Sequence, residues 1–108
     1  MTKKFSVGEI SEPVKFAIDD DEFEALPKNR FPAGSMAKYF EQINQNKLFE
    51  AQDYLFKVIL TKPSAKLFFE RMNSTDNPIT VSVLGDIVSW LLSEVYMQGE
   101  ASEESKPS

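Results

Sequence analysis

The segment from Thr80 to Met97 constrains the fold of this chain most, because its apolar residues follow a helical period on two sides. A broad stripe at 3.6-residue spacing is typical of a helix that faces a core. This stripe consists of Val81, Leu84, Ile87, Val88, Leu91, Leu92 and Val95. Val83, Trp90 and Met97 recur at seven-residue intervals and form a second line on the opposite side. One apolar face is enough to dock a helix, so the second line requires another surface to cover it.

Two interpretations of the second line are open. In the first, the helix is central, and the rest of the chain covers its far side through a hairpin or through the helix that contains Phe68 and Phe69. In the second, Val83, Trp90 and Met97 form an exposed strip that docks onto another protein or onto a second copy of this chain. A fully covered large apolar side chain stabilises a fold by about 1.5–3 kcal/mol, so bare Trp90 and Met97 would be tolerated only for binding.

The helix expected at about 48–61 raises the same question. Its apolar stripe is wide, and Tyr54 and Val58, together with Ala51, extend the stripe further around the helix. Core packing explains this width, and so does a groove for a partner helix. Asp53 and Lys57 lie on the opposite side, where their i, i+4 spacing favours an ion pair.

Composition and charge describe one globular domain and exclude several classes of partner. The chain has 108 residues, of which 42% are hydrophobic and 27% charged, with a net charge of −5. A negative chain with no basic run beyond Lys3 and Lys4 is not expected to bind nucleic acid. Its longest apolar stretch, from Ile87 to Leu92, is too short to span a bilayer, and its start lacks the apolar core of a secretory signal. We therefore expect a soluble intracellular protein that does not bind membranes.

The first part of the chain predicts a flexible arm followed by a hairpin. Residues 1–13 have scattered apolar residues and read as a loose arm or a first short strand. Alternation over 14–18 predicts a half-buried strand, and 23–26 predicts its return partner. Asp19 to Glu22 form the polar turn between the two strands.

The rest of the chain predicts about four helices. Ser35 is expected to cap the first, which ends near residue 46, and the second follows at 48–61. Ser64 caps a short third helix, and Thr80 caps the last. Residues 14–98 are thus expected to form a single, mainly α domain with an N-terminal β-hairpin. Residues 99–108 are acidic, small and polar, and we expect them to be a disordered tail.

Catalytic and metal-binding residues are scarce. The chain has no His and no Cys, which removes the commonest proton-transfer group and the usual zinc ligands. Ser35 and Lys38 have an S-x-x-K spacing, but the other motifs of serine β-lactamases are absent, and an N-cap followed by a surface lysine explains the match. The acids at 19–22 are consecutive, unlike the alternating ligands of an EF-hand. We expect no enzyme activity, no metal and no cofactor; an enzyme that uses carboxylates alone is the weakest alternative.

The order of the segments resembles that of the tail assembly chaperones of long-tailed (siphovirus-type) bacteriophages, especially those that infect actinobacteria. The resemblance covers about Val14 to Met97. Its segments are VKFAIDDDEFEALP, FPAGSM, LFEAQDYLFKVIL, SAKLFFERM, NSTDNPI and TVSVLGDIVSWLLSEV. The last helix is the most specific part, through Leu84, Gly85, Asp86, Ile87, Val88, Trp90 and Leu91. The chain departs from many relatives in being rich in Lys and Asn and poor in Ala, which leaves the host group open.

The resemblance implies a protein that is not an enzyme. Such chaperones bind the long, helical tape measure protein in the host cytoplasm, keep it soluble while the tail tube assembles, and are absent from the mature virion. The family also commonly makes a longer product by ribosomal frameshifting, which would extend the acidic tail. We expect the partner surface to include Tyr54, Val58, Val83, Trp90 and Met97. The alternative function is a small intracellular adaptor or regulatory protein that dimerises through its C-terminal helix.

Overall fold

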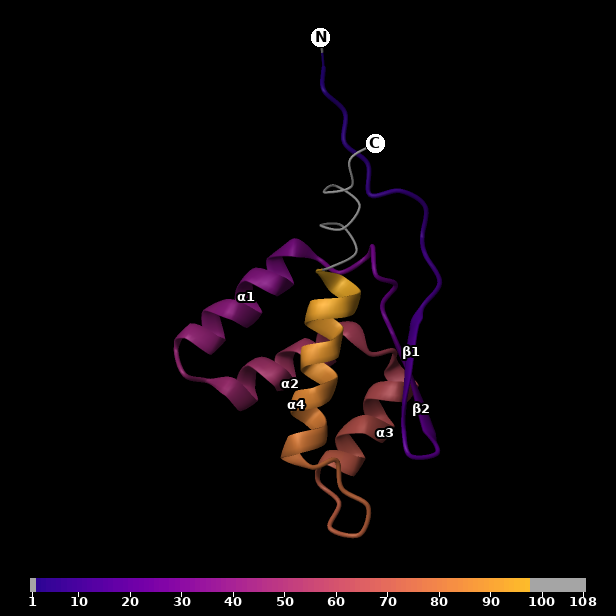
Figure 1. Ribbon diagram of the computed structural model, residues 1–108, viewed down its shortest axis with the longest axis vertical. Helices are drawn as coiled ribbons and strands as arrows, with labels where there is room; N and C mark the ends of the chain where they lie inside the picture. Colours follow the sequence, from indigo (N-terminus) through magenta and orange to yellow (C-terminus); the bar gives the residue numbers. More distant parts are fainter. Residues whose placement is uncertain (1, 98–108) are drawn as a thin grey trace.

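The computed structural model describes residues 2–97, which form an N-terminal β-hairpin followed by four helical rods (Figure 1). This confirms the predicted mainly α fold with an N-terminal hairpin. The helices number four, as predicted, because the last two helical elements follow each other without a break. The elements are β1 (Val14–Ile18), β2 (Asp21–Ala25), α1 (Ala33–Asn44), α2 (Leu48–Ile59), α3 (Lys62–Met72), α4 (Val81–Trp90) and the π-helix η1 (Leu91–Tyr96). The tail predicted at 99–108 lies outside the described residues. Within those residues, no helix is long and apolar enough to cross a membrane.

The hairpin has a tighter turn than the sequence predicts. Val14 pairs with Ala25 and Ile18 pairs with Asp21, so only Asp19 and Asp20 lie between the strands. Asp19 adopts a left-handed backbone with φ 55°, a conformation in which Asp and Asn are enriched. The first strand is therefore confirmed at 14–18. The second begins at residue 21, and its predicted start at 23 was wrong because the turn needs only two residues.

A third extended segment covers the outer edge of the hairpin. Leu60 forms an antiparallel bridge with Ala25, the N–H of Leu26 donates to the carbonyl of Ile59 at 2.9 Å, and the N–H of Thr61 donates to the carbonyl of Glu24 at 3.1 Å. A two-stranded hairpin alone is marginal, and this segment supplies backbone partners to its free edge. The pairing of Leu60 also ends α2 at Ile59, before the predicted limit of 61.

Two predicted helix caps were wrong and one is confirmed. Helix α1 begins at Ala33, directly after an extended Pro32, so Ser35 lies inside its first turn. Thr61 precedes α3, and the hydroxyl of Ser64 accepts a hydrogen bond from the N–H of Glu24 at 2.8 Å. Thr80 caps α4 as predicted, because its Oγ1 accepts the N–H of Val83 at 3.2 Å.

The core is centred on the ring of Phe68, which joins the hairpin to the helices. Its centroid lies 4.4 Å from that of Phe56, 5.4 Å from that of Phe23 and 6.4 Å from that of Phe16. Phe68 is fully buried, as are the rings of Phe23 and Phe56. In Figure 1 the hairpin and α3 lie on one side of α4, and the α1–α2 pair extends on the other.

A buried arginine fastens the hairpin turn to the loop before α4. Arg71 donates to the carbonyl of Ile18, to Asp19 Oδ2, to Asp21 Oδ2, and to both the carbonyl and Oδ1 of Asn77, at 2.9–3.3 Å. These five bonds match the five N–H groups of a guanidinium. The carboxylates of Asp19 in the turn and of Asp21 at the start of β2 thus neutralise a buried cation, a role that was not predicted for them.

Candidate protein-binding groove

A change of helical pitch divides the last helix at Trp90. Helix α4 is followed without a break by η1, whose hydrogen bonds run from i to i+5. The wider turn of a π-helix changes the direction in which every later side chain points. Projection on a regular α-helix therefore places Val83 and Trp90 correctly relative to each other but misplaces Met97.

The structure separates the three residues of the second line. The ring of Trp90 is half-buried and lies edge-on to Phe16 of β1, with centroids 6.2 Å apart. Met97 follows η1 and is 46% exposed, and Val83 in the first turn of α4 is 36% exposed. Trp90 thus faces the hairpin, as in the first of the two interpretations, whereas Met97 faces α1 and remains open.

The predicted binding residues of α2 are partly covered by the chain itself. Tyr54 is half-buried, and Lys38 Nζ of α1 lies 4.7 Å from the centre of its ring. Val58 is half-buried against the core. The exposed apolar residues of α2 are instead Leu48 and Phe49 in its first turn, the latter 60% exposed, although the sequence places both on the core stripe.

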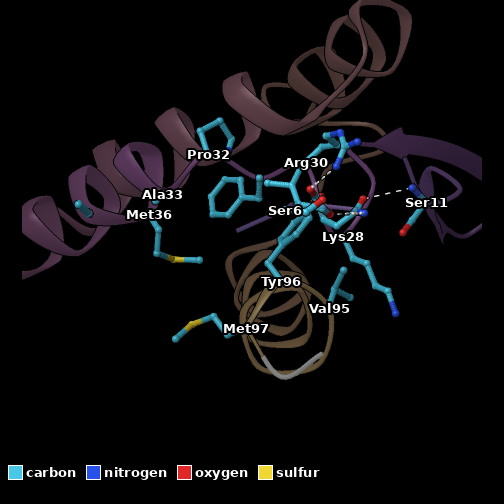
Figure 2. Close-up of a pocket in the computed structure, with 14 residues that line it drawn as sticks. Ser6, Ser11, Lys28, Arg30, Pro32, Ala33, Met36, Val95, Tyr96 and Met97 are labelled. Carbon is cyan, nitrogen blue, oxygen red and sulfur yellow. Dashed lines mark hydrogen bonds between the residues drawn. The ribbon is translucent and has the colours of Figure 1, made fainter. Parts of the chain in front are cut away.

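A groove of about 1180 Å³ lies between the N-terminal half of α1 and the end of η1 (Figure 2). Met36 reaches into it from α1 and Met97 from the end of η1, so two thioether side chains face the same space. Phe31, Pro32 and Tyr96 also line it. Of these residues, only Met97 belongs to the predicted binding set.

The floor of the groove is held in place by Tyr96. Its ring stacks on that of Phe31 with centroids 4.8 Å apart, and its hydroxyl donates to the carbonyl of Leu26 at 2.9 Å. Burial raises the pKa of the Tyr96 hydroxyl well above its ordinary value, so it remains a neutral donor even in mildly alkaline solution. The end of η1 is therefore tied to the exit of the hairpin, which gives the groove a rigid base.

The N-terminal arm forms one wall of the groove. Asn29 donates to the carbonyls of Val7 and Glu9, at 3.2 and 2.6 Å, and accepts the N–H of Ser11 at 3.2 Å. Arg30 donates to the carbonyl of Gly8 at 2.9 Å. Residues 2–13 contain neither helix nor strand, yet these bonds fasten 7–11 to the loop before α1.

The charged residues that line the groove have one sign. Lys28 and Arg30 contribute cations, and the lining includes no Asp or Glu among the described residues. This contrasts with the net charge of −5 of the whole chain. The described part of the lining thus combines apolar side chains with polar groups and two cations.

The arrangement is suited to binding an apolar side-chain stripe. Methionine side chains are flexible and polarisable, so they adapt to partners of different shape. Within residues 2–97, no group of three or more His, Cys, Asp or Glu side chains is placed to hold a metal ion. Ser35 and Lys38 both lie on α1, where Lys38 contacts Tyr54.

Most of this groove was not predicted from the sequence, since Phe31, Pro32 and Met36 lie outside the predicted binding set. The signal for it was the FPAGSM segment, which places an aromatic residue and a methionine on either side of a helix start. No family model matches the chain, and neither a curated protein nor a solved structure matches it significantly.

Proposed function

We propose that this chain is a phage tail assembly chaperone, which binds the tape measure protein in the host cytoplasm and keeps it soluble until the tail tube encloses it. The observation that carries the proposal is the groove between α1 and η1, where Met36 and Met97 face open space on a rigid aromatic base. The resemblance of residues 14–97 to such chaperones supplies the identity of the partner. The chaperone is not a component of the mature virion.

The groove fits the chemistry of such a partner. A long helical protein presents apolar stripes at 3.6-residue spacing, which aggregate unless they are covered. Two methionines, a proline and an aromatic floor offer contacts that do not require one particular sequence. A chaperone that covers many similar segments of one long helix needs this tolerance.

Purified full-length chain mixed with fragments of the tape measure protein tests the proposal by sedimentation. The unmodified chain should keep the fragments in the supernatant. The double variant Met36→Gln and Met97→Gln should retain its helical circular dichroism but bind about tenfold more weakly or worse, because each side chain loses apolar contact. Val81→Gln, which changes an exposed valine outside the groove, is the matched control and should bind normally. Equal retention by all three chains would reject the groove as the binding site.

A second candidate function is a small adaptor that dimerises through its C-terminal helix. It is favoured by Val81 and Val83, which are both exposed in the first turn of α4. A dimer formed there would dissociate in the variant Val81→Gln and Val83→Gln, which light scattering would detect. The gene position also separates the two functions, because a chaperone gene should lie between the tail tube and tape measure genes.

A further inference from the structure

We propose that residues 2–7 of one copy of this chain add a strand to the free edge of β1 in a second copy, and that two copies exchange these arms reciprocally. The exchange concerns self-association, so it does not rest on binding of the tape measure protein. Four features carry the inference: an open sheet edge, an extended apolar arm, the charges on both, and an anchor that keeps the arm away from its own sheet.

The outer edge of β1 is open. Ile18 pairs with Asp21 across a two-residue turn, so alternate residues of β1 direct their main-chain groups to β2. The N–H and C=O groups of Lys15 and Ala17 point the other way, and both residues are exposed. Among residues 2–97 nothing bonds to these four groups, because the bridge from Leu60 covers only the opposite edge, that of β2. An unpaired edge of this kind accepts a further strand.

The arm at residues 2–7 has the length and the side chains of such a strand. It contains neither helix nor strand, whereas β1 itself has five residues. Phe5 is 87% exposed and Val7 is 72% exposed. In an extended strand these two side chains lie on the same side, since successive side chains alternate. Two large apolar side chains this close in one exposed segment are typical of an interaction site.

One antiparallel register gives both apolar side chains of the arm a place to bind. When Phe5 lies opposite Phe16 of the second copy, Val7 lies opposite Val14, on the side of the sheet that faces Trp90. An open pocket of about 370 Å³ adjoins this side, and its lining includes Val14 and Trp90. The added strand would therefore extend the apolar side of the sheet over the half-buried Trp90 ring.

The charges favour the same register. It places Lys3 and Lys4 at the turn end of the second copy's β1, where Asp20 and Glu22 are exposed. A register two residues closer to the start of β1 would place Lys4 opposite Lys15, and like charges directly opposite each other destabilise a sheet. A parallel arm would carry both lysines to the other end of β1, away from the acidic turn.

An anchor directs the arm away from its own sheet. Asn29 donates to the carbonyls of Val7 and Glu9, and Arg30 donates to that of Gly8, so residues 7–9 are fastened to the loop before α1. Gly8 has a φ of 78°, which bends the chain at this point. In Figure 1 the arm extends to the end of the molecule that lies farthest from the hairpin turn. Reciprocal exchange in a closed dimer covers both arms and both edges at once.

Light scattering on full-length chains, measured over a dilution series, tests the exchange. The unmodified chain should approach twice its monomer mass as its concentration rises. Phe5→Ser removes the exposed ring, and Ala17→Pro removes an N–H that faces the open edge and makes no bond to β2. Each change should raise the dissociation constant of the dimer at least tenfold. Phe49→Ser, at an exposed position of α2, is the matched control and should leave that constant unchanged.

Proline in the arm tests which side of it pairs. With Phe5 on the side of Trp90, the N–H of Lys4 faces β1 of the second copy and that of Lys3 faces solvent. Lys4→Pro should therefore weaken the dimer at least tenfold, whereas Lys3→Pro, which removes the same charge one residue earlier, should weaken it less than about threefold.

A mixture of two defective chains provides the sharpest test. Phe5→Ser keeps an intact edge and Ala17→Pro keeps an intact arm, so the mixture should contain a dimer that neither chain forms alone. Phe5→Ser changes a side chain that the fold does not use, and it keeps the dilution series decisive if Ala17→Pro fails to fold.

Four outcomes would overturn the exchange. They are a monomer at every concentration, a dimer that survives Phe5→Ser, a mixture without dimer, and hydrogen exchange at Ala17 that is slow in the monomer, which would mean that the arm folds back on its own β1. A dimer lost only in the variant Val81→Gln and Val83→Gln would assign self-association to the C-terminal helix instead. The measurements contain no tape measure fragment, so a failure of the proposed function leaves them unchanged.

Discussion

Arg71 holds Asn77 by two hydrogen bonds, from Nε to the main-chain oxygen at 3.0 Å and from Nη2 to Oδ1 at 2.9 Å. The same guanidinium reaches the carbonyl of Ile18, a residue 53 positions earlier, at 3.0 Å. One side chain thus determines where the loop before α4 lies relative to the hairpin turn. The position of α4, and with it one wall of the groove, depends on this contact.

Replacing Arg71 by Met should lower the free energy of unfolding by about 2–4 kcal/mol, because buried carbonyl oxygens lose charged donors. The carboxylates of Asp19 and Asp21 retain access to water, which keeps the cost below that of an isolated buried charge. Urea denaturation followed by circular dichroism measures the change. Lys66→Met, on the exposed face of the same helix, should change stability by less than about 0.5 kcal/mol. Equal stability of both variants would show that the Arg71 bonds contribute nothing.

Because Phe68 lies at the centre of the aromatic core, shortening its side chain should lower the free energy of unfolding in proportion to the atoms removed. Phe68→Leu should cost about 1–2 kcal/mol through lost ring contacts, and Phe68→Ala about 3–5 kcal/mol through the cavity it leaves. Phe49→Ala removes the same side chain at an exposed position of α2 and should be close to neutral. Thermal unfolding of the three variants provides the comparison, and a large loss at Phe49 would mean that this ring is covered.

Substitutions of Trp90 and Met97 should have different effects on the free energy of unfolding, although the sequence places both residues on one line of the helix. Trp90→Gln loses the contact with Phe16 and should lower the free energy of unfolding by about 1–3 kcal/mol. Met97→Gln changes an exposed side chain beyond the last helical turn and should leave it within about 0.5 kcal/mol. Similar losses in both variants would contradict the change of direction introduced by η1.

Stability should fall above about pH 10, and Tyr96 should account for part of the fall. Its pKa is raised in the folded state by burial, so the unfolded chain releases the phenolic proton first. The folded state then binds more protons than the unfolded state, and stability falls as pH rises, by up to about 1.4 kcal/mol per pH unit. The pKa of Tyr39, which is also buried, is raised by burial as well and contributes in the same direction. Tyr96→Phe should show a shallower slope between pH 10 and 12 in urea denaturation, and an unchanged slope would exclude Tyr96 as its source.

Local patterns predicted the elements of this fold because each depends on neighbouring residues. Alternation from Val14 to Ile18 and the hydroxyl of Thr80 before α4 were sufficient for those two features. Ser64 was misassigned because its partner, the N–H of Glu24, comes from a strand 40 positions earlier. No local pattern reveals which of several available groups a hydroxyl will bind.

The groove was harder to predict because it depends on two features with no periodic signal. The π-helical turns of η1 change the direction of Tyr96 and Met97, and a regular helical projection cannot show this. The stacking of Phe31 on Tyr96 joins a loop to a helix end 65 positions later. Helical spacing correctly marked three of the predicted binding residues as apolar positions, namely Tyr54, Val58 and Trp90. It could not show that they are half-buried, because that depends on how the rest of the chain, including α1 and the hairpin, packs against them.

The long sequence separation between Arg71 and its partners in the hairpin also limits when the hairpin can fold during synthesis. The hairpin strands and their turn leave the ribosome early, but their buried counter-charge arrives only about fifty residues later. Until then the carboxylates of Asp19 and Asp21 repel each other without a nearby cation. The free edge of β2 also lacks hydrogen-bond partners, since Thr61 and Ser64 follow Glu24 by some forty residues. A nascent chain stalled before α3 should therefore remain sensitive to proteases throughout its first quarter, and should become resistant once the third helix has emerged.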